Sequence, residues 1–207
     1  MESEQTVTIE KQAKAAIYGF LAGIFCTAPS ADSAGALREL ATDLGIACPR
    51  EIPLDELRQE YLELLVIPNP RYVAPYESVF RDQWPLPPVL KRGSNPAETG
   101  ATIKGLLMGE STLAVRDCYL KQGLLPEEDL PDHISNELRF LAYVCAREAE
   151  APPEEARKWA ELAGRFRRDH VLQWIADLRA RVAERERCGY YGSALRVVEA
   201  VLREEAD

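Results

Sequence analysis

His133 and His170 are the two histidines of the chain and its best candidates for acid–base or metal chemistry. His133 and Glu137 are four residues apart, so both fall on one face of a predicted helix, where they can share a ligand or contact each other. Two side chains make a poor metal site, and an acid–base pair would also need a substrate pocket. His170 lies between Phe166 and Trp174 on an apolar helical face, which predicts a buried histidine with a structural role.

Asp132 allows two interpretations. Its carboxylate could receive a cationic ligand. Asp129 or Asp132, on either side of Pro131, could equally be a helix N-cap, because a side-chain oxygen there accepts hydrogen bonds from the free N–H groups of the first turn. These residues alone leave both roles open.

The sequence lacks the common motifs of catalysis. Gly100 and Gly105 have the spacing of the first half of a phosphate-binding loop, but Leu106 follows where that motif needs lysine. There is no GxGxxG or GxSxG pattern, and neither histidine has a glutamate three residues before it, as a di-iron site in a helical bundle requires. We therefore predict a protein that is not an enzyme and has no metal ion or other cofactor.

Composition indicates one large, acidic globular domain. The 207 residues are 46% hydrophobic and 29% charged, enough apolar surface for a substantial core. The formal net charge is −9, and an acidic surface repels phosphate backbones. We therefore expect no nucleic-acid partner, and cationic peptides are better candidates.

The five cysteines predict free thiols in a reducing compartment. Their number is odd, their spacing is wide and none forms a CxxC pair. The longest apolar run, Ala15 to Cys26, is too short to span a bilayer. The segment before it contains three glutamates and is not positively charged overall, unlike the start of a signal peptide. We expect a cytoplasmic protein without stable membrane insertion.

Helical periodicity dominates the chain and predicts an all-α, single-domain helical bundle. In the first helix we expect an apolar stripe of Ala13, Ala16, Ile17, Phe20, Leu21 and Ile24. Further helices are predicted over residues 32–44, about 54–65, about 96–120, 134–145, 166–182 and 191–202. No run alternates with the period of a β-strand.

A proline-rich stretch, residues 68–96, interrupts the helices. Seven prolines fall within it, together with the aromatic residues Tyr72, Tyr76, Phe80 and Trp84. Proline disfavours helix, so we predict a long extended loop. Loops of that length are often functional or disordered. Four aromatic side chains argue against disorder and suggest that the loop is either pinned to the helices or used in binding.

Two segments resemble the signatures of a known family. Residues 61–80 read YLELLVIPNPRYVAPYESVF, and residues 130–141 read LPDHISNELRFL. They are similar to the motifs of the TorD/DmsD/NarJ family of redox-enzyme maturation chaperones. The run FRRDHVLQW at residues 166–174 and the pair Tyr190–Tyr191 also resemble the family's C-terminal part, so the similarity spans roughly Ala13 to Leu202. One departure is Leu130, where the family commonly has glutamate.

The resemblance implies a single all-helical TorD-like chaperone domain over residues 1–207, with the loop at about 68–96. It implies a client, the apo catalytic subunit of a molybdenum or tungsten oxidoreductase or its twin-arginine signal peptide, held until the cofactor is inserted. The chaperone would be a monomer or a homodimer. The residues expected to line the client-binding surface are Tyr76, Glu77, Trp84, Asp132 and His133, with Glu137 beside His133.

The chemistry of these residues suits such a client. Carboxylates such as Asp132 and Glu77 can form bidentate, charge-assisted pairs with guanidinium groups, and Trp84 can stack on them. An apolar groove would take the hydrophobic part of the peptide. Two alternatives stay open: a helical scaffold or interaction protein, and a guanine-nucleotide-binding protein built around His133, Glu137 and Asp132.

Overall fold

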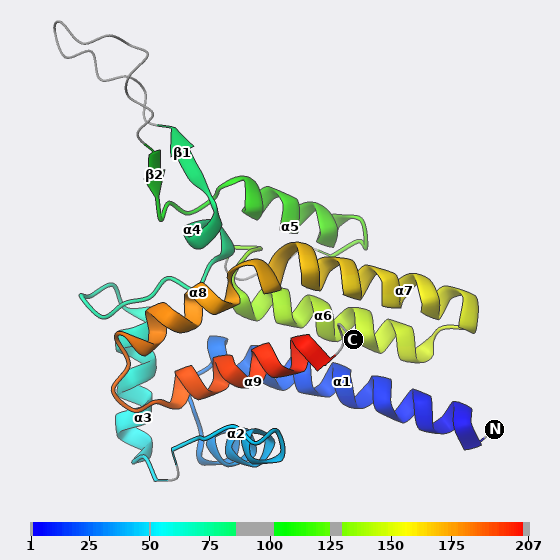
Figure 1. Cartoon of the computed structure of the whole chain (residues 1–207), viewed down its shortest axis with the longest axis horizontal. Helices are drawn as coiled ribbons and strands as arrows, with labels where there is room; N and C mark the ends of the chain where they lie inside the picture. Colours follow the sequence, from blue (N-terminus) through cyan, green and yellow to red (C-terminus); the bar gives the residue numbers. More distant parts are fainter. Residues whose placement is uncertain (1, 50, 86–101, 125–129, 205–207) are drawn as a thin grey trace, which may run out of the picture.

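The computed structural model describes residues 2–49, 51–85, 102–124 and 130–204, and it confirms the predicted all-α bundle (Figure 1). The α-helices are α1 (Glu2–Cys26), α2 (Ala31–Asp43), α3 (Leu54–Tyr61), α4 (Glu77–Arg81), α5 (Glu110–Leu120), α6 (Ile134–Glu150), α7 (Pro153–Phe166), α8 (Leu172–Ala183) and α9 (Tyr190–Glu204). Within the described residues, no helix combines the length and apolar composition needed to cross a bilayer.

The core lies where α1 packs along α6, with α7 on the other side of α6 and α8 and α9 closing the bundle (Figure 1). α6 contributes Ile134, Leu138 and Leu141 to the interior, in agreement with its predicted stripe. The stripe predicted for α1 is only partly correct. Leu21 and Ile24 are buried, but Ala13 and Ala16 are exposed, while Tyr18, Ala22 and Phe25 complete the buried face.

The helix predicted over residues 96–120 begins later, at Glu110. Before it, strand β2 (Thr102–Lys104) pairs with β1 (Gln83–Pro85) as an antiparallel hairpin in which Trp84 faces Ile103. Residues 86–101, which hold the rest of the predicted loop, lie outside the described residues.

Asp82 fixes the start of α5. Its carboxylate accepts hydrogen bonds from the Ser111 N–H at 3.0 Å and the Ser111 hydroxyl at 2.6 Å. A Cβ on Gly109 would lie 1.8 Å from the Asp82 carboxylate, so this close approach requires glycine. Helix α5 therefore begins where a carboxylate from the preceding segment caps it.

Two π-helical turns interrupt the helices at the motifs. η1 (Leu62–Val66) continues α3 into the loop, and η3 (Arg167–Val171) joins α7 to α8. π-turns within helices often occur at functional sites, because the extra residue redirects side chains. η3 carries His170, and the proline-rich loop that follows η1 carries Tyr76.

Candidate functional site

The two signature segments pair with each other through their backbones. The Glu77 N–H donates to the Asp132 carbonyl, and the Ile134 N–H donates to the Pro75 carbonyl, each at 2.9 Å. These bonds make an isolated antiparallel bridge between Tyr76 and His133, whose rings meet edge to face with centroids 5.0 Å apart. The fold thus brings Tyr76 and His133 together from distant parts of the sequence.

His133 is the N-cap of α6. Its backbone is extended, and its Nδ1 accepts a hydrogen bond from the Ser135 N–H at 3.2 Å. The prediction that His133 and Glu137 share a helical face is therefore wrong, because the helix begins one residue after His133. The prediction of Asp132 as the cap of this helix is also wrong, and Asp129 lies outside the described residues.

Asp132 instead caps the first turn of α4. Its Oδ2 accepts from the Ser78 N–H at 2.9 Å, and the residue is fully buried. Asp132 is therefore a helix cap, as one of the two interpretations predicted, but it caps α4, which lies far away in the sequence.

Glu77 is fully buried in an ion-pair network. Its carboxylate pairs with the Arg81 guanidinium and lies 3.0 Å from His170 Nδ1. Arg81 also donates to the Asp169 carbonyl at 2.8 Å. These contacts hold α4 against η3, and they confirm that His170 is a buried histidine with satisfied ring nitrogens.

Glu137 also points into the core. Its Oε2 accepts from the indole N–H of Trp174 at 3.1 Å, and the side chain is fully buried. Burial raises the pKa of Glu137 well above its usual range, and the neighbouring charges of Glu77 and Asp132 add to that shift. Burial therefore favours the neutral form of the Glu137 carboxyl.

Tyr119 and His170 respond to the same environment. Burial raises the pKa of Tyr119 well above its ordinary value, and any negative charge on Glu137 would raise it further. Burial alone would lower the pKa of His170, but hydrogen bonds to Cys118 and Glu77 outweigh it and set the value at about 9. His170 is thus cationic at neutral pH. Despite the carboxylates gathered here, no three His, Cys, Asp or Glu side chains of the described residues are arranged to hold a metal ion.

Replacing Glu137 with glutamine is expected to keep or raise stability at pH 7, because glutamine has the shape of the neutral acid. The folded-state pKa of Glu137 is raised, so its stabilising contribution is complete below the unfolded pKa and is lost as pH rises. The variant should therefore lose less stability than wild type as pH rises above about 5. Urea unfolding across this range measures the difference. Glu161→Gln at the surface is the control, and coincident profiles for Glu137→Gln and wild type would show that Glu137 is ionised.

Tyr76 and His133 open onto a pocket of about 440 Å³ between the end of α1, η1 and the start of α6. We call it the aromatic pocket; its lining includes Phe25, Cys26, Tyr61, Val66, Tyr72, Tyr76, His133, Asn136 and Arg139. Asn136 and Arg139 were missed by sequence reasoning, although both lie in the second signature segment. Four predicted site residues are buried: Glu77, Asp132 and Glu137 completely, and His133 with 5% of its surface exposed. Trp84 lies on β1 with 43% of its surface exposed.

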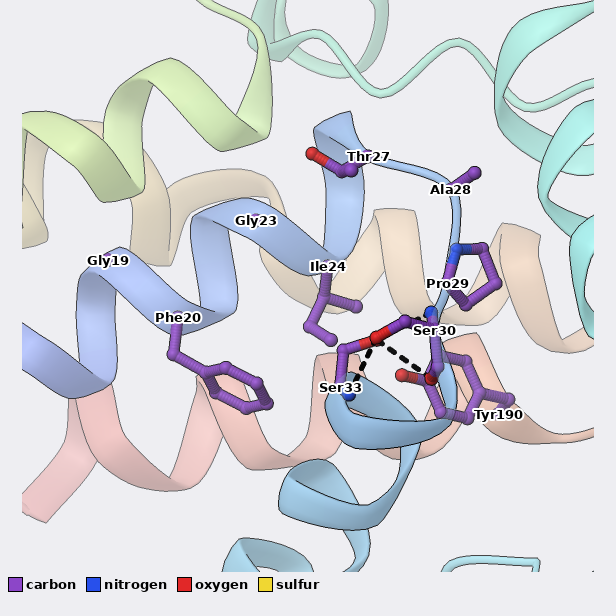
Figure 2. A pocket seen from close by; sticks show the side chains of 10 residues that line it. All are labelled: Gly19, Phe20, Gly23, Ile24, Thr27, Ala28, Pro29, Ser30, Ser33 and Tyr190. Carbon is purple, nitrogen blue, oxygen red and sulfur yellow. Dashed lines mark hydrogen bonds between the residues drawn. The ribbon is translucent and has the colours of Figure 1, made fainter.

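A second pocket lies beside α1 and holds about 320 Å³ (Figure 2). This α1 pocket is lined by Gly19, Phe20, Gly23, Ile24, Thr27, Ala28, Pro29, Ser30, Ser33 and Tyr190. Ser30 and Ser33 form a capping box that starts α2 at its edge. A Cβ placed on Gly19 or Gly23 would meet no atom within 4 Å, so the two glycines leave the α1 side of the pocket open.

The family model of the nitrate reductase delta subunit matches residues 27–180, which include both paired segments and η3. The chain belongs to this family. A crystal structure from Archaeoglobus fulgidus, described as a redox enzyme maturation protein, is similar over 82% of this chain and 92% of its own, with 21% identity and a TM-score of 0.41. No curated protein matches the sequence. Membership of the nitrate reductase delta subunit family confirms the resemblance to TorD- and NarJ-type proteins.

Proposed function

We propose that this chain is a maturation chaperone that binds the apo catalytic subunit of a molybdenum or tungsten oxidoreductase, or its twin-arginine signal peptide. In this role it holds the client until the cofactor is inserted. The observation that carries the proposal is the pairing of Tyr76 with His133 at the rim of the aromatic pocket, because it joins both family signatures at one accessible site. Membership of the nitrate reductase delta subunit family supports the class of client.

In the proposed complex the client contacts aromatic side chains, and the buried carboxylates hold those side chains in place. Glu77 and Asp132 have no exposed surface, and His133 keeps 5% of its surface exposed, so an arriving guanidinium would first contact the partly exposed Tyr76, with the edge of His133 beside it. Aromatic faces bind guanidinium groups and apolar peptide side chains alike. Glu77 and Asp132 hold α4, and α4 in turn fixes the backbone of Tyr76.

The α1 pocket is a suitable receptor for the apolar part of the client (Figure 2). Phe20 and Ile24 give it an apolar wall, and the missing side chains of Gly19 and Gly23 give it depth. Both pockets border the C-terminal end of α1, the aromatic pocket at Phe25 and Cys26 and the α1 pocket at Ile24 and Thr27. A peptide with a polar and an apolar part could therefore use both.

Replacing His133 with asparagine is expected to weaken client binding about tenfold, the loss of one well-placed aromatic contact of about 1.4 kcal/mol. Asparagine is itself a good N-cap, so α6 should keep its start and stability should barely change. Titration calorimetry with the apo subunit measures affinity, and thermal unfolding checks the fold. Leu120→Ala, an exposed change on α5, is the control. Unchanged affinity in His133→Asn would remove His133 from the binding surface.

Gly23→Leu is expected to fill the α1 pocket and lower client affinity by about tenfold or more, through loss of buried apolar contact. The change should not destabilise the fold, because a Cβ at Gly23 meets nothing and leucine is a far better helix former than glycine. Gly35→Leu, an equally unhindered glycine on α2 outside the pocket, is the matched control. If both variants bind the client as wild type does, the α1 pocket plays no part.

A further inference from the structure

Cys118, His170 and Glu77 stand in line across three elements. The Cys118 Sγ on α5 lies 3.8 Å from His170 Nε2 on η3, and His170 Nδ1 lies 3.0 Å from Glu77 Oε2 on α4. Activated nucleophiles in proteins have this order: a nucleophile meets a base, and an acid orients the base. The proposed chaperone function uses none of the chemistry that this arrangement allows.

Glu77 decides which ring nitrogen faces the thiol. Its carboxylate can only accept, so His170 donates through Nδ1–H and turns Nε2 toward Cys118. The ring is nearly buried and packs on Phe166 with centroids 4.8 Å apart, which fixes its orientation. Cys118 is half-buried, so a small reagent can reach it.

The local charges favour a reactive thiolate. His170 is cationic at neutral pH, and a thiolate is stabilised beside an imidazolium. Glu77 is paired with both Arg81 and His170, and Asp132 accepts from the Ser78 N–H. Burial favours the neutral form of Glu137 on α6, and Tyr119 stays protonated because its pKa is raised. The anionic groups around the pair are therefore already partnered or neutralised.

The other cysteines lack this environment. Burial raises the pKa of Cys48 and of Cys188, and Cys145 is buried. Cys26 lies beside the Arg139 guanidinium at 3.1 Å, and its Sγ also contacts the Gly23 carbonyl and the Thr27 hydroxyl. Exposure does not distinguish Cys118, since Cys26, Cys48 and Cys188 are also partly exposed. What distinguishes it is the neighbouring imidazole of His170.

We propose that Cys118 is a redox modification site that forms a mixed disulfide with a small-molecule disulfide of the glutathione type. The Cys118 proton passes to solvent, and the thiolate that remains beside the His170 imidazolium attacks one sulfur of the incoming disulfide. The new S–S bond forms as the old one breaks, and the leaving thiolate takes up a proton from solvent. Cys118 is oxidised, and one half of the disulfide is reduced to a thiol. The reaction needs no client, so it stands independently of the proposed function.

The test exposes the full-length protein to oxidised glutathione at pH 7 and follows each cysteine by peptide mass spectrometry. Cys118 is expected to form the adduct about tenfold or more faster than Cys48 or Cys188. His170→Gln should reduce the Cys118 rate to that of the other two, while leaving theirs unchanged. Equal rates for the three cysteines in the wild-type protein would overturn the proposal.

A pH series on the wild-type protein keeps the test decisive if His170→Gln does not fold. Alkylation of Cys48 by iodoacetamide should slow about tenfold for each pH unit below 8, following the fraction of thiolate. Alkylation of Cys118 should slow less than that of Cys48 over the same interval, because a thiolate beside an imidazolium is stabilised. A Cys118 rate that falls in parallel with that of Cys48 would contradict activation by His170.

Discussion

Replacing Arg71 with methionine is expected to lower the free energy of unfolding by about 3–5 kcal/mol, the usual cost of breaking a buried ion pair from one side. Arg71 donates to Glu60 at 2.6 Å, pairs with Glu63, and donates through Nε to the Arg185 carbonyl at 2.9 Å. Glu60 is nearly fully buried, so the substitution would leave its carboxylate in the interior without its ion-pair partner. For a chain of this size the midpoint of thermal unfolding should fall by about 10 °C.

The control for Arg71 is Arg157, which pairs with Glu161 at 3.8 Å on the exposed face of α7. Arg157→Met should change stability by less than about 0.5 kcal/mol, because exposed ion pairs contribute little. Similar losses in the two variants would mean that Arg71 does not anchor the proline-rich loop to the turn between α8 and α9.

Glu77→Gln is expected to cost about 3 kcal/mol near pH 6, because it leaves the buried His170 imidazolium and the Arg81 guanidinium without their carboxylate. The folded-state pKa of His170, about 9, exceeds its ordinary value of 6.5. Its stabilising contribution is therefore complete below the unfolded pKa and is lost as pH rises through about 9. The cost of Glu77→Gln should shrink accordingly in alkali.

Denaturant unfolding of wild type and Glu77→Gln at about pH 6 and about pH 9.5 measures this difference. We expect the difference in free energy of unfolding between wild type and Glu77→Gln to decrease by about 1–3 kcal/mol from the lower to the higher pH. Each unit of pKa shift corresponds to about 1.4 kcal/mol. Glu161→Gln should show no such change with pH. A gap that is constant with pH would show that His170 is not the titrating partner of Glu77.

The helices could be predicted from the sequence because their signal is local. Apolar residues at helical spacing marked α6, α8 and α9, and the apolar neighbours of His170 predicted its burial. The late start of α5 could not be predicted, because it depends on a carboxylate from Asp82, 29 positions before Ser111. Caps of this kind arise from tertiary contacts and leave no periodic pattern.

The sequence identified residues of the site, but it could not show which of them touch or which are buried. The family motifs identified Tyr76 and His133, yet only the long-range backbone bridge shows that they touch. The family resemblance places Glu77 and Asp132 on the binding surface, with Glu137 beside His133, and polar residues are usually exposed. Their burial depends on partners from other elements, such as Trp174 for Glu137 and Ser78 for Asp132. Sequence spacing does not reveal such partners.

In the proposed function, this protein recognises an immature molybdoenzyme subunit through the aromatic pocket. The most direct measurement titrates it with the catalytic subunit of a nitrate-reductase-type molybdoenzyme from the same host, prepared once without its pterin cofactor and once loaded with it. We predict micromolar to submicromolar binding of the apo subunit, about −8 to −9 kcal/mol, with the loaded subunit bound far more weakly and His133→Asn weakened about tenfold. Equal affinity for the two forms, or no binding of either, would contradict the account.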